Sequence, residues 1–142
     1  VILFSKNYTV LCRKLYAIAA YEGTGYNLWV YIKEVVMTHV IQDYLVQLEY
    51  LLKQHQRWQN EPIDNEALHS TVPFCHDTMA FEQWLQFVFI KKMSLLIKQQ
   101  QPLPSNMSIA PMAELMLSKS IGSDEIIELL KEIDNFFGRV ND

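Results

Sequence analysis

Apolar residues recur every three or four positions along most of this chain, and prolines separate the stretches in which they do so. One such stretch covers residues 37–58 and another covers residues 78–100. This spacing places apolar side chains on one face of an α-helix. Pro62 lies after the first stretch and Pro102 after the second, where a ring without an N–H group prevents a helix from continuing. The pattern predicts helices joined by proline-containing loops.

Two long helices are expected from these stretches. The first begins near Thr38 and the second near Thr78, and we expect each hydroxyl to cap the free N–H groups of the first turn. The apolar face of the first helix consists of Ile41, Tyr44, Leu45, Leu48, Leu51, Leu52, His55 and Trp58. At about 100° per residue, the main apolar arc of the second consists of Phe81, Trp84, Leu85, Val88, Phe89, Leu95 and Leu96.

Lys92 falls in the middle of the apolar arc of the second helix. An unpaired charge at such a position is costly, so we expect Lys92 to pair with a carboxylate or to extend its ammonium group into water. The candidate carboxylates are Asp77, Glu82 and Glu114. Other apolar residues lie elsewhere on the wheel, so this helix is expected to be buried on most sides. These residues are Phe87, Ile90, Met93 and Ile97.

Two shorter helices are expected near the C-terminus. Pro111 suits the first turn of a third helix over residues 112–119. A fourth begins with Ser123 as its cap and acidic residues in its first turn, and Gly138 is expected to end it. Its apolar face consists of Ile126, Ile127, Leu129, Leu130, Ile133, Phe136 and Phe137. No alternating strand pattern follows Met37. The predicted fold is all-α, a small antiparallel bundle of about four helices.

The first 36 residues differ from the rest, because they hold five of the seven tyrosines and no methionine. Three interpretations remain open. They could form a β-hairpin around residues 22–25 or a helix over residues 9–21, or they could be an upstream extension that precedes a native start at Met37. The last interpretation has a specific motive, because codons for Lys33-Glu34-Val35 can contain a purine-rich ribosome-binding sequence. We therefore divide the chain into an N-terminal extension, residues 1–36, and a helical domain, residues 37–142.

Composition limits the class of protein. Half of the 142 residues are hydrophobic, which suffices for one core, and no apolar run reaches the roughly 20 residues that span a bilayer. Two cysteines, Cys12 and Cys75, are too few for a disulfide framework, so a reducing cytoplasm is expected. The net charge of −4 argues against a nucleic-acid surface spread over the whole molecule.

Three adjacent residues invite a catalytic or metal-binding interpretation, namely Cys75-His76-Asp77, with His69 shortly before them. Adjacent residues rarely point at one another, and a zinc site needs about four ligands. The simpler interpretation is a loop thiol followed by the entry into a helix. No catalytic residue, metal ligand or cofactor is therefore predicted.

Partner binding is predicted around the loop between the two long helices. Aromatic side chains such as Phe74 anchor interfaces, although at helical spacing they more often belong to a core. The candidate partner-binding residues are Pro73, Phe74, Asp77, Trp84, Trp58 and Lys92. Two small basic spots, Lys53 with Arg57 and Lys91-Lys92, do not form a stripe. We expect these four residues to be solvated helix charges more often than RNA contacts.

Several separated motifs, in order, resemble those of the YqcC-like family. They are Leu51-Leu52 to Trp58, Pro62, Ser70-Thr71-Val72-Pro73-Phe74, Asp77-Thr78-Met79, Trp84-Leu85-Gln86, Met93, Pro102-Leu103-Pro104 and Ile109-Ala110-Pro111. The resemblance covers about residues 37–140. It implies a small bacterial all-helical protein that is associated, by gene neighbourhood and by name, with tRNA pseudouridine synthase C.

The chain itself does not resemble such a synthase. Those enzymes have a larger mixed α/β domain and a catalytic aspartate in an Arg-Leu-Asp type motif, and none of Arg13, Arg57 and Arg139 precedes Leu-Asp. The first hypothesis is a non-catalytic accessory protein that binds a protein partner, plausibly the synthase. The alternatives are an RNA-binding adaptor that uses the four basic residues above and, less favoured, an enzyme centred on residues 75–77.

Overall fold

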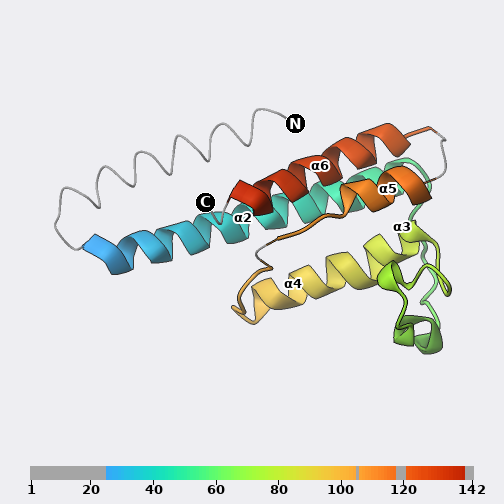
Figure 1. Ribbon diagram of the computed structural model, residues 1–142, viewed down its shortest axis with the longest axis horizontal. Helices are drawn as coiled ribbons and strands as arrows, with labels where there is room; N and C mark the ends of the chain where they lie inside the picture. Colours follow the sequence, from blue (N-terminus) through green and yellow to red (C-terminus); the bar gives the residue numbers. More distant parts are fainter. Residues whose placement is uncertain (1–24, 105, 118–120, 140–142) are drawn as a thin grey trace. The chain divides into compact units, whose positions relative to one another are not determined.

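The computed structural model describes residues 25–104, 106–117 and 121–139, and the fold is all-α, as predicted (Figure 1). Four helical segments account for it. The segments are α2 (Gly25–Gln54), the continuous run α3 (Phe81–Trp84), η3 (Leu85–Ile90) and α4 (Lys91–Lys98), then α5 (Ala110–Met116) and α6 (Ser123–Arg139). Two short 3-10 turns, η1 (Asn65–His69) and η2 (Pro73–Cys75), lie in the loop after α2. Within the described ranges, no helix is both long and apolar enough to cross a bilayer.

Packing divides the chain into two compact units between Asp43 and Tyr44. In the first unit, α2 continues through Met37 without interruption, and Thr38 lies inside the helix. The Thr38 hydroxyl donates a hydrogen bond to the carbonyl of Glu34 at 2.8 Å. The prediction that Thr38 caps a helix is therefore wrong, because the helix begins at Gly25. The second strand of the hairpin would follow residue 25, where α2 is helical, so the hairpin prediction is wrong. The helix over residues 9–21 lies outside the described residues, and the start at Met37 stays a prediction.

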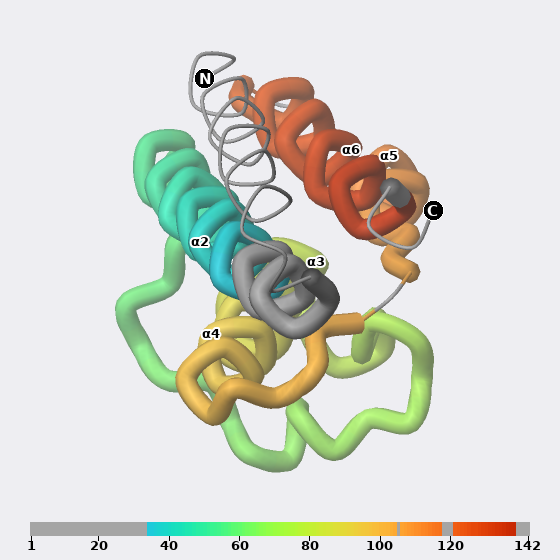
Figure 2. The backbone as a smooth tube through the Cα atoms, turned by 90° about the vertical axis from the view of Figure 1, so that its left-hand side faces the viewer, coloured from blue at the N-terminus to red at the C-terminus, as the bar shows by residue number. Residues whose placement is uncertain are grey.

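The core of the second unit takes apolar side chains from all of its helices. The larger ones are Leu48, Leu52, Phe81, Leu85, Met93, Ile126, Leu130, Ile133 and Phe137, all at most 2% exposed. α5 and α6 form a hairpin and run side by side in both views (Figures 1 and 2). The core of α6 is predicted correctly by its sequence spacing, because its buried residues recur at helical steps.

The N-terminus of α5 is capped from the facing helix. The carboxylate of Asp134 on α6 accepts hydrogen bonds from the backbone N–H groups of Ile109, at 2.8 Å, and Ala110, at 2.8 Å. Pro111 follows in the first turn, where its missing N–H group leaves nothing to satisfy. The prediction for Pro111 is confirmed, and one carboxylate fixes the start of α5 against α6.

The run from Phe81 to Lys98 contains a π-helical segment, η3, in its middle. A π-turn takes one more residue than an α-turn, so everything beyond it is rotated by about 100° relative to a regular helix. The buried stripe accordingly moves by one position, from Lys92 to Met93, which is 1% exposed. Lys92 is exposed and forms no ion pair with any described residue, and Leu95 is 51% exposed. Of the two expectations for Lys92, pairing with a carboxylate is therefore wrong, and extension of its ammonium group into water agrees with its exposure.

Other helix ends also differ from the sequence prediction, and α5 covers Ala110–Met116 in place of residues 112–119. The first long helix stops at Gln54, before Trp58, and the chain turns through Gln56, whose φ is 57°. The second begins at Phe81, because the Thr78 hydroxyl donates to the carbonyls of the preceding loop instead of capping a helix. Gly138 does not end α6, which continues to Arg139. α6 begins at Ser123 and has acidic residues in its first turn, as predicted, whereas the role of Ser123 as the cap stays a prediction.

Candidate functional site

The loop before α3 has an unusual backbone at Phe74 and Cys75. Their φ values are 58° and 50°, in the left-handed region that residues with a side chain rarely occupy. Two such residues in succession cost of order 1–3 kcal/mol each and persist only where the surroundings hold them. Ring contacts hold Phe74 here, because its centroid lies 4.8 Å from that of Trp84 and 5.9 Å from that of Phe81.

These rings form an aromatic cluster that continues along the helix. Trp84 stacks on Phe81 with centroids 5.7 Å apart and on Phe89 at 6.0 Å. Phe81 and Phe89 are buried, whereas Phe74 and Trp84 remain partly exposed. The structure therefore brings together two of the predicted partner-binding residues, Phe74 and Trp84, at the edge of the core.

Residues 75–77 differ in their exposure to solvent. Cys75 is a free, buried thiol, whereas His76 and Asp77 are exposed. Asp77 accepts a hydrogen bond from the Ser70 hydroxyl at 2.5 Å, which closes the loop, and Pro73 is exposed at its start. No group of side chains able to hold a metal ion occurs among the residues that the structure describes.

The segment after α2 carries a buried ion pair that sequence reasoning missed. Arg57 donates from Nη1 to the Glu82 carboxylate on α3 and from Nη2 to the Ser123 hydroxyl at 2.7 Å. The side chains of Arg57 and Glu82 are 8% and 19% exposed. The prediction of a solvated charge at Arg57 is wrong, and the burial of its guanidinium argues against an RNA contact there. Its planar fork reaches two acceptors on different helices, which a solvated lysine would not do.

Glutamines extend this arrangement. The Gln86 side chain, in a residue 5% exposed, bonds twice to the backbone of Gln59. It donates to the Gln59 carbonyl at 2.7 Å and accepts from the Gln59 N–H at 2.9 Å. Gln83 donates to the side-chain oxygen of Gln59 at 2.7 Å and accepts from the backbone N–H of Ala80 at 2.8 Å. We call Arg57, Gln59, Glu82, Gln83, Gln86 and Ser123 the polar junction. The sequence signal for the polar junction is Gln86, because an amide in a buried apolar helix needs hydrogen-bond partners.

The other residues singled out in the sequence, Trp58 and the lysines, do not belong to the aromatic cluster. Trp58 is partly exposed, and the ammonium of Lys53 lies over its ring, 4.9 Å from the ring centroid. Lys53 is also paired with Glu49 one helical turn earlier. The ammonium of Lys91 lies 4.9 Å from the ring centroid of Phe87, and the next residue, Lys92, is exposed. Exposed cation–π and ion-pair contacts of this kind are weak and leave the lysines accessible.

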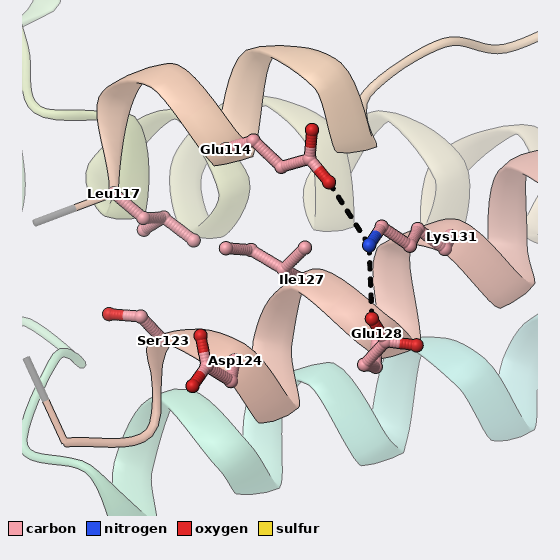
Figure 3. Close-up of a pocket in the computed structure, with 7 residues that line it drawn as sticks. All are labelled: Glu114, Leu117, Ser123, Asp124, Ile127, Glu128 and Lys131. Carbon is pink, nitrogen blue, oxygen red and sulfur yellow. Dashed lines mark hydrogen bonds and ion pairs between the residues drawn. The ribbon is translucent and has the colours of Figure 1, made fainter. Parts of the chain in front are cut away.

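A groove of about 530 Å³ opens between α5 and α6 (Figure 3). We call it the α5–α6 groove, and its lining consists of Glu114, Leu117, Ser123, Asp124, Ile127, Glu128 and Lys131. The side chains of Leu117 and Ile127 point toward each other across it. Sequence reasoning did not predict this groove, because Glu114 and Glu128 lie on different helices and only the hairpin brings them together.

Lys131 joins the two sides of the α5–α6 groove. Its ammonium lies 3.0 Å from a carboxylate oxygen of Glu128, on its own helix, and 3.0 Å from one of Glu114 on α5. Hydrogen bonds to Glu128 and then to Glu114 raise the pKa of Lys131 above its usual value of 10.5. The Lys131 side chain is 42% exposed, so the groove keeps a charged pair in contact with water.

Comparison with known proteins identifies the family. The family model described as "DUF446: tRNA pseudouridine synthase C" matches residues 40–136. The chain belongs to this family, the YqcC-like family. Its relatives include the uncharacterized protein YqcC of Escherichia coli (strain K12), 42% identical over 71 residues, which are 50% of this chain and 65% of the relative. The match thus spans slightly less than two thirds of that relative's length.

The solution NMR structure of protein YqcC from E. coli has the same fold. It aligns with a TM-score of 0.64 at 34% identity, over 71% of this chain and 87% of that one. An uncharacterized protein of Haemophilus influenzae is 38% identical over 78 residues, 55% of this chain and 74% of the relative. The resemblance of the sequence to the YqcC-like family is thereby confirmed.

A third relative is much longer. A protein of Pectobacterium carotovorum subsp. carotovorum named tRNA pseudouridine synthase C is 39% identical over 64 residues, 45% of this chain but 17% of the relative. More than four fifths of that protein therefore lies outside the match. Where the structure describes this chain, it contains no strand, so the mixed α/β domain expected of a synthase is absent from those residues.

Proposed function

We propose that this YqcC-like protein is a non-catalytic accessory protein that binds a tRNA pseudouridine synthase. The observation that carries the proposal is the relative named tRNA pseudouridine synthase C, in which a YqcC-like segment is 17% of a longer chain. A segment that shares a polypeptide with an enzyme in one organism is a good candidate to bind that enzyme as a separate chain in another. The description of the family points to the same enzyme.

The chemistry of the described residues fits a binding role better than a catalytic one. Cys75 is buried, whereas its neighbours His76 and Asp77 are exposed, and a nucleophilic thiol needs a base oriented toward it. The net charge of the chain is −4, and an enzyme that binds tRNA presents clustered basic residues. Opposite charges of this kind favour encounter between the two proteins.

Partly exposed aromatic residues provide a plausible contact. Phe74 and Trp84 lie at the edge of the core, fixed by their neighbours in the aromatic cluster. Rigid aromatic side chains lose little entropy on binding and often dominate an interface. The loop 73–77 and Trp84 therefore remain our candidates for partner contact, whereas Trp58 and Lys92 lack a comparable connection to them.

Direct RNA binding is the second candidate function. α4 presents three exposed lysines, Lys91, Lys92 and Lys98, and none of them forms an ion pair with a described residue. Arg57 no longer supports this candidate, because its guanidinium is buried in the polar junction. Three lysines on one short helix are a small footprint for RNA, so protein binding is the stronger proposal.

Co-purification tests the two candidates together. The tagged full chain is expressed in its own cells, and the amount of tRNA pseudouridine synthase C that it retains is measured with and without RNase treatment. Retention that survives RNase is the expected result. Loss of the synthase on RNase treatment would favour RNA binding, and absence of the synthase in both samples would contradict the main proposal.

A further inference from the structure

We propose that the α5–α6 groove binds a basic segment of the partner that also carries an apolar side chain. This inference rests on the proposed function and names the surface that carries it out. The groove combines an apolar floor with acidic edges. Leu117 and Ile127 form the floor, and carboxylates lie along both edges, Glu114 on α5 and Asp124 with Glu128 on α6 (Figure 3).

The carboxylates of the groove are accessible and already hold one cation. The side chains of Glu114 and Glu128 are 51% and 70% exposed, and both accept from the Lys131 ammonium. Asp124 is exposed and forms no ion pair with the described residues, so its carboxylate is available to a second cation. The chain thus shows that an ammonium group is stabilised where the two helices meet.

The charge balance of the groove selects among possible occupants. Among the described residues that line the groove, three carboxylates stand against one ammonium and repel a phosphate backbone, so an RNA is disfavoured. A second copy of this chain is disfavoured too, because a two-fold contact would place the same acidic edges against each other. A tRNA-binding enzyme must carry clustered lysine and arginine residues, so a segment of such a protein supplies the complementary charge.

The size of the groove limits what enters it. A volume of about 530 Å³ accommodates a few side chains and not a whole protein surface. The bound segment is expected to place a lysine or arginine against Asp124 and Glu128 and an apolar side chain against Leu117 and Ile127. Because the carboxylates are exposed, their contribution falls as salt screens it.

A peptide assay tests the groove by itself. The probe is a labelled, amidated helical peptide of leucine and lysine, and a second peptide carries glutamate in place of lysine. Binding to the full chain is measured by fluorescence anisotropy at low and high salt. The lysine peptide is expected to bind at low salt, and to weaken about tenfold with the double variant Asp124→Asn, Glu128→Gln, from the loss of two charge contacts.

A matched variant separates local pairing from net charge. Glu61→Gln, Glu66→Gln removes the same charge from two exposed residues that do not line the groove. It is expected to change the affinity less than threefold. Equal weakening by both double variants, or equal binding of the glutamate peptide, would overturn the proposed groove site.

The same variants are then compared in co-purification with tRNA pseudouridine synthase C. Loss of the synthase by the groove variant alone supports the inference. Retention by both variants overturns the groove site and leaves the proposed function standing. Failure of the unmodified chain to retain the synthase overturns the proposed function, and the peptide assay alone then decides whether the groove binds basic segments.

Discussion

The polar junction and the α5–α6 groove use the same chemistry to different ends. In each, one cationic side chain joins two helices through two acceptors. Arg57 is 8% exposed and reaches Glu82 and Ser123, whereas Lys131 is 42% exposed and reaches Glu114 and Glu128. Removing one partner in the junction leaves a buried charge without a counter-charge, which is costly. Removing one partner in the groove leaves a charge that water still solvates. The junction therefore holds the fold together, and the groove remains available for binding.

The largest expected effect is that of Arg57→Ala. It leaves the Glu82 carboxylate and the Ser123 hydroxyl without their guanidinium partner, and we expect a loss of about 3–5 kcal/mol in the free energy of unfolding. Urea denaturation followed by circular dichroism measures it. A loss below about 1 kcal/mol would remove the distinction between junction and groove.

A second effect concerns Gly122, next to the junction residue Ser123. Its φ is +86°, and an added Cβ would lie 2.1 Å from Cγ of the His55 ring. Gly122→Ala is expected to cost about 2–4 kcal/mol, from backbone strain and overpacking together. Gly138 is the matched control, because a Cβ there meets nothing within 4 Å. Gly138→Ala should leave stability unchanged or raise it by up to about 1 kcal/mol, and equal losses in the two variants would contradict this account.

A smaller effect is expected for Lys131→Met in the groove. The methionine keeps the length and the apolar stem while it removes the charge, and exposed ion pairs stabilise a fold only weakly. Thermal unfolding under the conditions used for Arg57→Ala gives the comparison directly. A loss as large as that of Arg57→Ala would show that the groove is structural.

The smallest effect is the pH dependence of that ion pair. Because the folded state raises the pKa of Lys131, its contribution is fully present below the usual lysine value of 10.5 and is lost as pH rises through the folded pKa. The stability difference between the unmodified chain and Lys131→Met should thus be constant around neutral pH and shrink only in strongly alkaline solution. A difference that grows with alkaline pH would contradict the assigned direction.

Much of the helical core follows from sequence, because spacing alone identifies the buried faces of α2 and α6. The positions of Lys92 and Leu95 do not follow, since a wheel at a fixed angle per residue has no place for the π-turn before them. The burial of Arg57 also escapes the sequence, because its partners Glu82 and Ser123 are distant along the chain. The groove escapes for the same reason, since tertiary packing alone places Glu114 opposite Glu128.

The π-helical segment η3 makes the number of residues in this helix as important as their identity. It holds one residue more than the same turn of an α-helix would. That residue shifts the helical phase, because it rotates the side chains of the second half of the helix relative to those of the first half. Upstream, the phase directs Phe81 and Leu85 into the core, and downstream it directs Lys92 to water. If the same residues formed a regular α-helix without the π-turn, the apolar composition would be unchanged and yet Lys92 would turn inward. In this helix, one additional residue in a single turn decides which later residues are exposed to solvent.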